Sequence, residues 1–118
     1  MITHLKRNQI FVFGSNLAGI HAGGAARYAR EHFGAVEGVG EGLTGQCYAF
    51  PTLDKNFKQL NDERQHRAAW KFFNYARENP DKTFLLTKVG CGIAGQPEWY
   101  MKSLFKKSPE NVVKPQGW

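Results

Sequence analysis

Of the three glycine-rich stretches in this chain, two run into a segment with helical character. The first is VFGSNLAGIHAGGAARYA, residues 12–29, and the second is GCGIAGQPEW, residues 90–99. Because glycine has no Cβ, backbone N–H groups in such loops stay accessible, and the N-terminus of a following helix adds partial positive charge. One such loop is common in tight turns. Two in a chain this short predict a binding site for a diphosphate.

Neither of the two most familiar phosphate-binding fingerprints occurs in the first stretch. The first stretch lacks the Lys-Ser/Thr ending of a P-loop, and it lacks a G-x-G-x-x-G pattern with a matching acidic residue. The sequence therefore favours neither a P-loop NTPase nor a dinucleotide-dependent dehydrogenase.

Several polar side chains in or near the glycine stretches have two interpretations each. Asn16 can donate to and accept from ribose hydroxyls or hold a water, and it can equally serve as a turn residue. His21 is either a catalytic base or phosphate contact, or simply an exposed loop histidine. Cys91 fits a nucleophile or a small buried thiol. Glu41 and Asp54 fit water activation or surface solubility.

Composition limits the class of protein. With 118 residues, 42% of them hydrophobic, the chain is expected to form one ordered domain over residues 1–118. No apolar run approaches the roughly 18 residues that span a bilayer, and the N-terminus lacks the apolar region of a secretory signal. Two cysteines predict neither a disulfide framework nor a metal cluster. We therefore expect a cytoplasmic protein with reduced thiols, no membrane partner and no metal or cofactor.

The formal charge of +6 favours anionic partners such as nucleotides, phosphates or nucleic acid. The basic residues are spread along the chain, however, and no run of five occurs. Binding to DNA or RNA is therefore an alternative, but not the favoured one.

Periodicity predicts alternating strands and helices. Strands are expected at residues 9–13, 47–50 (ended by Pro51) and 83–89, with shorter ones near 36–39 and 111–113; helices are expected at 24–33, 61–78 and 97–107. Gly34 stands where the left-handed residue after a helix belongs. This order predicts an α/β domain with a largely parallel sheet. Ligands of such sheets bind beyond the carboxyl ends of the strands, so the two glycine loops should lie side by side at one edge.

Three segments, in the same order, resemble the macrodomain family. GSNLAGIHAGGAARYA resembles its signature, in which a glycine pair that opens a helix follows an asparagine; GLTGQCYAFPT resembles its second segment, and VGCGIAGQP resembles the loop that closes over a diphosphate. The resemblance covers roughly residues 11–97 and is greatest to small, divergent members from bacteria and phages. It implies a three-layer α/β/α fold with a mixed, largely parallel sheet.

The resemblance also implies a ligand and a site. The ligand would be ADP-ribose or a related nucleotide, free or attached to a macromolecule. Catalysis, which some macrodomains perform as ADP-ribosyl hydrolases or ADP-ribose 1″-phosphate phosphatases, would involve Asn16 and His21; a non-catalytic binding module is the alternative. The ligand-binding residues would be Gly14, Ser15, Asn16, Gly23, Gly24, Ala25, Gly90, Cys91, Gly92, Ile93, Ala94 and Gly95. No residue matches the acidic group that often hydrogen-bonds to adenine in this family, so the resemblance does not specify which base the ligand carries.

Overall fold

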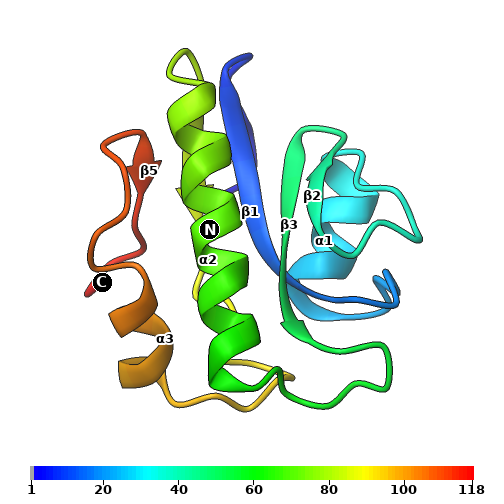
Figure 1. The fold of residues 1–118 in the computed structure, drawn as a ribbon. Helices are drawn as coiled ribbons and strands as arrows, with labels where there is room; N and C mark the ends of the chain where they lie inside the picture. Colours follow the sequence, from blue (N-terminus) through cyan, green and yellow to red (C-terminus); the bar gives the residue numbers. More distant parts are fainter. Residues whose placement is uncertain (1) are drawn as a thin grey trace.

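A computed structural model describes residues 2–118 of the chain, which form a five-stranded sheet and three helices (Figure 1). The elements in chain order are β1 (Gln9–Asn16), α1 (Gly24–His32), β2 (Gly42–Thr44), β3 (Cys47–Leu53), α2 (Asp62–Glu78), β4 (Thr83–Leu86), α3 (Glu98–Leu104) and β5 (Val112–Val113). None of the helices between residues 2 and 118 combines the length and apolar character needed to cross a membrane.

The strands run in the order β2-β3-β1-β4-β5. The central strand β1 is parallel to both β3 and β4, β5 is parallel to β4, and only the pairing of β2 with β3 is antiparallel. Helices α2 and α3 cover one face and α1 covers part of the other, which makes three layers (Figure 1). The predicted α/β fold with a mixed, largely parallel sheet is confirmed.

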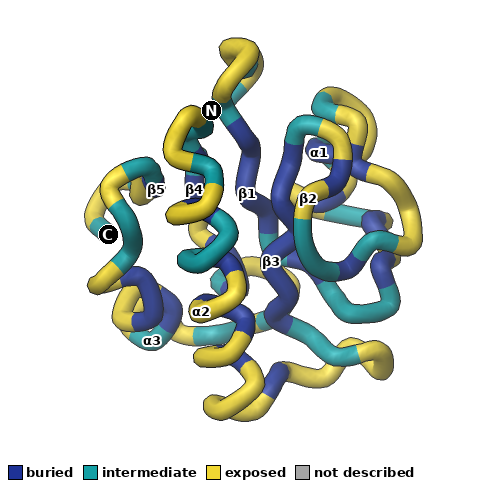
Figure 2. The backbone as a smooth tube through the Cα atoms, turned by 45° about the horizontal axis from the view of Figure 1, so that its top comes forward, coloured by how far each residue is buried: buried dark blue, intermediate teal, exposed yellow. Residues whose placement is uncertain are grey.

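Side-chain alternation along β1 separates the two apolar cores. Phe11 and Phe13 face α1, whereas Ile10 and Val12 pack into the cluster under α2 and α3. Successive residues of a strand point to opposite faces, so a fully apolar strand is the pattern of a sheet buried on both sides. The tube in Figure 2 shows β1 and β3 as the most buried elements.

Helix α2 begins and ends as its sequence predicts. The Asn61 side chain accepts a hydrogen bond from the Arg64 N–H at 2.8 Å, which caps the first turn, and Asp62 and Glu63 complement the helix dipole. From its inner face, Phe72 contacts aromatic rings from β3, β4 and the residue after α3: Tyr48, Phe50, Phe84 and Phe105. These rings join the sheet to both helices of this layer.

Three strand boundaries differ from the prediction. β1 continues beyond Phe13 to Asn16, because residues 14–16 still pair with β3. β3 continues through Pro51, where β2 no longer runs alongside and no neighbouring strand on that side requires an N–H group. β4 ends at Leu86: the Thr87 N–H and hydroxyl still donate to the Val12 carbonyl, the hydroxyl at 2.7 Å, and the chain then turns, with the Val89 N–H donating to the Thr87 carbonyl.

Two further expectations were wrong in detail. No strand forms at residues 36–39, which make a turn, and the short strand of this region is β2 at Gly42–Thr44. α3 is shorter than predicted and buries Met101, whereas Trp99 is exposed. The helix at residues 24–33, the helix at 61–78 and the last edge strand lie within a residue of their predicted positions, and Gly34 has the expected positive φ of 79°.

Candidate functional site

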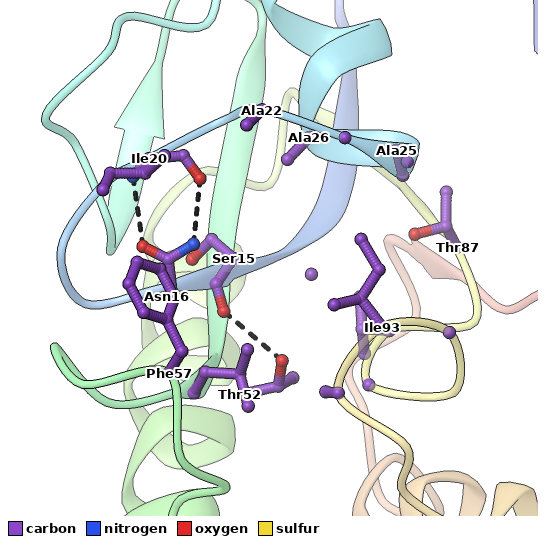
Figure 3. A pocket seen from close by; sticks show the side chains of 18 of the residues that line it. Ser15, Asn16, Ile20, Ala22, Ala25, Ala26, Thr52, Phe57, Thr87 and Ile93 are labelled. Atoms are coloured by element: carbon purple, nitrogen blue, oxygen red, sulfur yellow. Dashed lines mark hydrogen bonds between the residues drawn. The ribbon is translucent and has the colours of Figure 1, made fainter.

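A cleft of about 460 Å³ opens at the carboxyl ends of β1 and β3, between the two glycine loops (Figure 3). Of the predicted binding residues, those lining it are Gly14, Ser15, Asn16, Gly23, Gly24, Ala25, Gly90, Gly92, Ile93 and Ala94. The other lining residues are Ile20, Ala22, Ala26, Thr52, Leu53, Phe57, Thr87, Lys88 and Val89. The edge of the sheet on which the loops meet is therefore the predicted one.

The two glycine loops face each other across a narrow gap. A Cβ built on Gly23 would lie 3.6 Å from the Ile93 Cδ1 atom, and one on Gly24 would lie 3.8 Å from it. The Ile93 side chain is 82% exposed, although it is large and apolar. Its place over the cleft, opposite the first loop, gives that exposure a binding interpretation.

The N-terminus of α1 presents backbone donors to the cleft without a side-chain cap. Its N-cap residue, Gly23, makes no side-chain hydrogen bond, and the first turn holds no acidic residue. α2, by contrast, has both a capping asparagine and two acidic residues in its first turn. The first N–H groups of a helix need acceptors, and an anion in the cleft can supply them.

The second loop is shaped by contacts with α3 and with the segment after β3. Gly90 has a φ of +78°, and a Cβ there would lie 2.9 Å from the Met101 Cε atom, so no larger residue fits. On the other side, the Gln59 amide donates to the Ala94 carbonyl at 2.7 Å. Gln59 was not predicted, because nothing near it in the sequence marks it as a loop anchor.

The Asn16 side chain closes the first loop on itself. Its Nδ2 donates to the Ile20 carbonyl at 2.9 Å, and its Oδ1 accepts from the Ile20 N–H at 3.1 Å (Figure 3). Of the two interpretations of Asn16, the turn residue is thus realised in the structure. The amide still has one N–H and one lone pair unused, and Asn16 lines the cleft.

His21 lies outside the cleft, contrary to the catalytic role assigned to it. Its side chain is fully buried, with the ring 5.3 Å from that of Phe13 and the Nε2 atom 3.2 Å from the Val36 carbonyl. The Val36 carbonyl can only accept, so Nε2 is the donor, and the buried Nδ1 atom has no hydrogen-bond partner within residues 2–118. His21 joins the first loop to the 35–40 segment.

Cys91 and Gly95 also lie outside the cleft lining. The Cys91 side chain packs against the core under α2 and α3, with Sγ 3.5 Å from the Val89 carbonyl. Burial, followed by the negative charge of Glu98, raises the pKa of the Cys91 thiol, which disfavours the nucleophilic thiolate. The geometry therefore supports the interpretation of Cys91 as a small packed thiol and not as a nucleophile.

Residues from β3 and the loop after it complete the opposite wall. The Thr52 hydroxyl donates to the Ser15 carbonyl at 3.3 Å, and the Ser15 hydroxyl donates to the Gly40 carbonyl. Phe57 is half-exposed and has a φ of +61°, rare for a bulky residue. Only the carboxyl-end rule for parallel strands could have placed Thr52 here, and no sequence signal marks Phe57.

The side chains that line the cleft are mostly apolar or neutral and polar. Among the described lining residues, Lys88 carries the one charged side chain, and none is a carboxylate, an imidazole or a thiol. Over residues 2–118, no group of three potential metal-ligating side chains comes together. Comparison of the chain with protein-family models, curated proteins and solved structures gave no match. The functional conclusion therefore rests on the site itself.

Proposed function

We propose that the chain binds ADP-ribose or a related nucleotide diphosphate in the cleft between its two glycine loops. The observation that carries the proposal is that Gly23 and Gly24 of the first loop and Ile93 of the second line the same cleft, which puts two side-chain-poor loops on either side of it. The uncapped N-terminus of α1 supplies donors for one phosphate. The resemblance to macrodomains makes ADP-ribose the first ligand to test.

The polar and apolar walls suit the two parts of a nucleotide. Ser15, Asn16 and Thr52 supply hydroxyl and amide groups at the strand ends, where ribose hydroxyls need partners. Ile20 and Phe57 supply exposed apolar surface along the same wall. A few polar groups in a largely apolar, concave site are typical of small-molecule binding.

A binding module is favoured over a hydrolase. General acid–base catalysis needs a group that accepts a proton within hydrogen-bond reach of the reacting atom. The described lining residues include no carboxylate or histidine, and the buried His21 ring does not reach the cleft. Hydrolysis would therefore depend on positioning of a water alone.

Calorimetric titration with ADP-ribose tests the proposal, with AMP and inorganic pyrophosphate as partial ligands. We expect saturable binding of ADP-ribose that is tighter than that of either part. A turnover assay on an ADP-ribosylated protein, run beside it, should show no release over hours. Absence of ADP-ribose binding would overturn the proposal. Turnover would show that the chain is an enzyme and not a binding module.

A further inference from the structure

One face of the sheet is only partly covered by helices. α1 packs over β1 and β3 through an apolar cluster that, among the described residues, includes none from β4 or β5. In Figure 1, α1 and β5 lie on opposite sides of the molecule. On the other face, α2 and α3 cover β4 and β5, where Phe84 and Val112 are buried.

The uncovered part of this face forms an apolar groove of about 570 Å³, larger than the cleft. Leu85 of β4 and Val113 of β5 lie in its floor, since each alternates with a neighbour buried on the opposite face. Val113 is 49% exposed. Phe11 and Tyr28, whose rings are 6.2 Å apart, form the side towards α1.

The groove adjoins the cleft. Thr87 lines both, at the point where the chain leaves β4. On the α1 side, Ala25 lines the cleft and Tyr28, one helical turn later, lines the groove. A ligand that extends from the cleft past Thr87 would therefore reach the groove.

The charged side chains that line the two cavities are basic. Among the described lining residues these are Lys88 in the cleft, which is paired with Glu98 at 3.0 Å, and Lys114 in the groove, and neither lining includes a carboxylate. A phosphate-bearing ligand that extends from one cavity to the other therefore meets no acidic side chain in either lining. The groove offers apolar and aromatic surface, which suits a ring and not a second phosphate chain.

We propose that the groove receives a second ring of the ligand, attached beyond the diphosphate, so that the full ligand is a dinucleotide-like molecule with two ring systems. This inference rests on the proposed function, because the diphosphate must first lie between the glycine loops. It specifies the ligand class of that site: one ring lies in the cleft, and the other lies between Tyr28 and Val113.

A matched pair of ligands tests the proposal on the intact chain. Diadenosine diphosphate differs from ADP-ribose in that a second adenine replaces the terminal hydroxyl on C1 of the far ribose. Burial and stacking of this ring should make diadenosine diphosphate bind about tenfold more tightly than ADP-ribose. Equal or weaker binding of diadenosine diphosphate, with ADP-ribose bound, would overturn this inference and leave the proposed function intact. Binding of neither ligand would overturn both.

Variants locate the second ring. Val113→Glu places a charge in the groove at a half-exposed position, and Val36→Glu makes the same charge change at an exposed residue that lines neither cavity. We expect Val113→Glu to abolish the tenfold tighter binding of diadenosine diphosphate over ADP-ribose. The affinity for ADP-ribose should be the same in Val113→Glu and Val36→Glu. An unchanged advantage in Val113→Glu would overturn the proposal. The groove could instead hold a second copy of the chain, and sedimentation equilibrium tests this. If the parent is a dimer that Val113→Glu dissociates, and diadenosine diphosphate binds the parent no more tightly than ADP-ribose does, the groove is assigned to a second copy of the chain.

Discussion

Gly23 and Ile93 belong to different glycine loops, yet a Cβ on Gly23 would lie within 3.6 Å of the Ile93 side chain. The two loops follow β1 and β4, which are adjacent and parallel, so their carboxyl ends deliver both loops to the same edge. Gly23 has an extended backbone (φ −157°) that any residue can adopt. Its lack of a side chain is therefore not required by the backbone conformation, and it keeps this side of the cleft open.

The first prediction concerns the open space at the second loop. A Cβ at Gly92 would meet no atom within 4 Å, and Gly92 lacks the positive φ that penalises side chains. Gly92→Val should therefore unfold at close to the parent temperature while ADP-ribose affinity falls by at least about tenfold, because the side chain projects into the space needed by phosphates. Calorimetry and thermal unfolding measure the two effects.

Gly92→Ala and Gly23→Val complete this series. The smaller Gly92→Ala change should weaken binding less than Gly92→Val, and Gly23→Val tests the facing loop from an equally unstrained backbone. Gly24 is a poorer position, since its φ of +60° makes any substitution strained. Parent-like affinity in both valine variants would show that the cleft does not hold the ligand.

The second prediction concerns the anchor of the second loop. Gln59→Ala removes the hydrogen bond to the Ala94 carbonyl and should weaken ADP-ribose binding several-fold, with a stability loss of about 1 kcal/mol. Gln46→Ala is the matched control: the Gln46 amide donates to the Lys6 and Gln9 carbonyls, away from the cleft. Equal ligand affinities in the two variants would contradict a role for Gln59 in positioning the loop.

Sequence reasoning found the sheet and the two loops because both depend on local patterns. The apolar run at β1 and the capped, amphipathic α2 each specify their element without distant partners. The rule for parallel strands then placed the loops together, which is a consequence of topology alone. The bounds of α1 and α2 were accurate for the same reason, whereas α3 is shorter than predicted.

Tertiary contacts decided the rest. The chain turns out of β4 directly after Thr87, which still bonds to the Val12 carbonyl, and the buried His21 contacts the Phe13 ring and the Val36 carbonyl. Neither contact can be predicted from the spacing of residues in the sequence. Phe57 enters the cleft wall from a loop whose conformation has no sequence signal.

The third prediction separates the two roles of Asn16. Asn16→Ala removes both hydrogen bonds to Ile20 and should destabilise the fold by about 1–2 kcal/mol. Asn16→Asp keeps the acceptor for the Ile20 N–H, so it should recover part of this stability. If Asn16 also contacts a ribose hydroxyl through its free N–H, Asn16→Asp should still bind ADP-ribose more weakly than the parent. Parent-like affinity of Asn16→Asp would restrict Asn16 to the turn.

The fourth prediction concerns the core that positions the strands. Phe72 is fully buried and contacts rings from β3, β4 and the residue after α3, so Phe72→Ala should cost about 3–5 kcal/mol of unfolding free energy. Trp70→Ala, on the same helix but 65% exposed, should cost less than about 0.5 kcal/mol. Denaturant unfolding compares them, and similar losses would contradict the packing described here.

The fifth prediction is a pH dependence of stability. The hydrogen bond from Lys88, followed by that from Trp118, lowers the pKa of Glu98 from its ordinary value of 4.5; the two donors lie 3.0 Å from the same Glu98 oxygen. A carboxylate whose pKa is lowered by folding stabilises the fold above its unfolded pKa, and this contribution is lost as pH falls through the folded pKa. The unfolding temperature should therefore decrease as the pH is lowered below about 4.5, and this decrease should be less steep in Glu98→Gln.

Glu110→Gln is the control for this effect, because Glu110 is exposed and forms no ion pair within residues 2–118. It should keep the parent's acid slope, whereas Glu98→Gln should begin from a lower unfolding temperature at neutral pH and converge with the parent in acid. Asp54 and Glu31, whose pKa values are also lowered, leave part of the slope in both variants. A parent-like slope in Glu98→Gln would mean that the contacts of Glu98 with Lys88 and Trp118 do not stabilise the folded state.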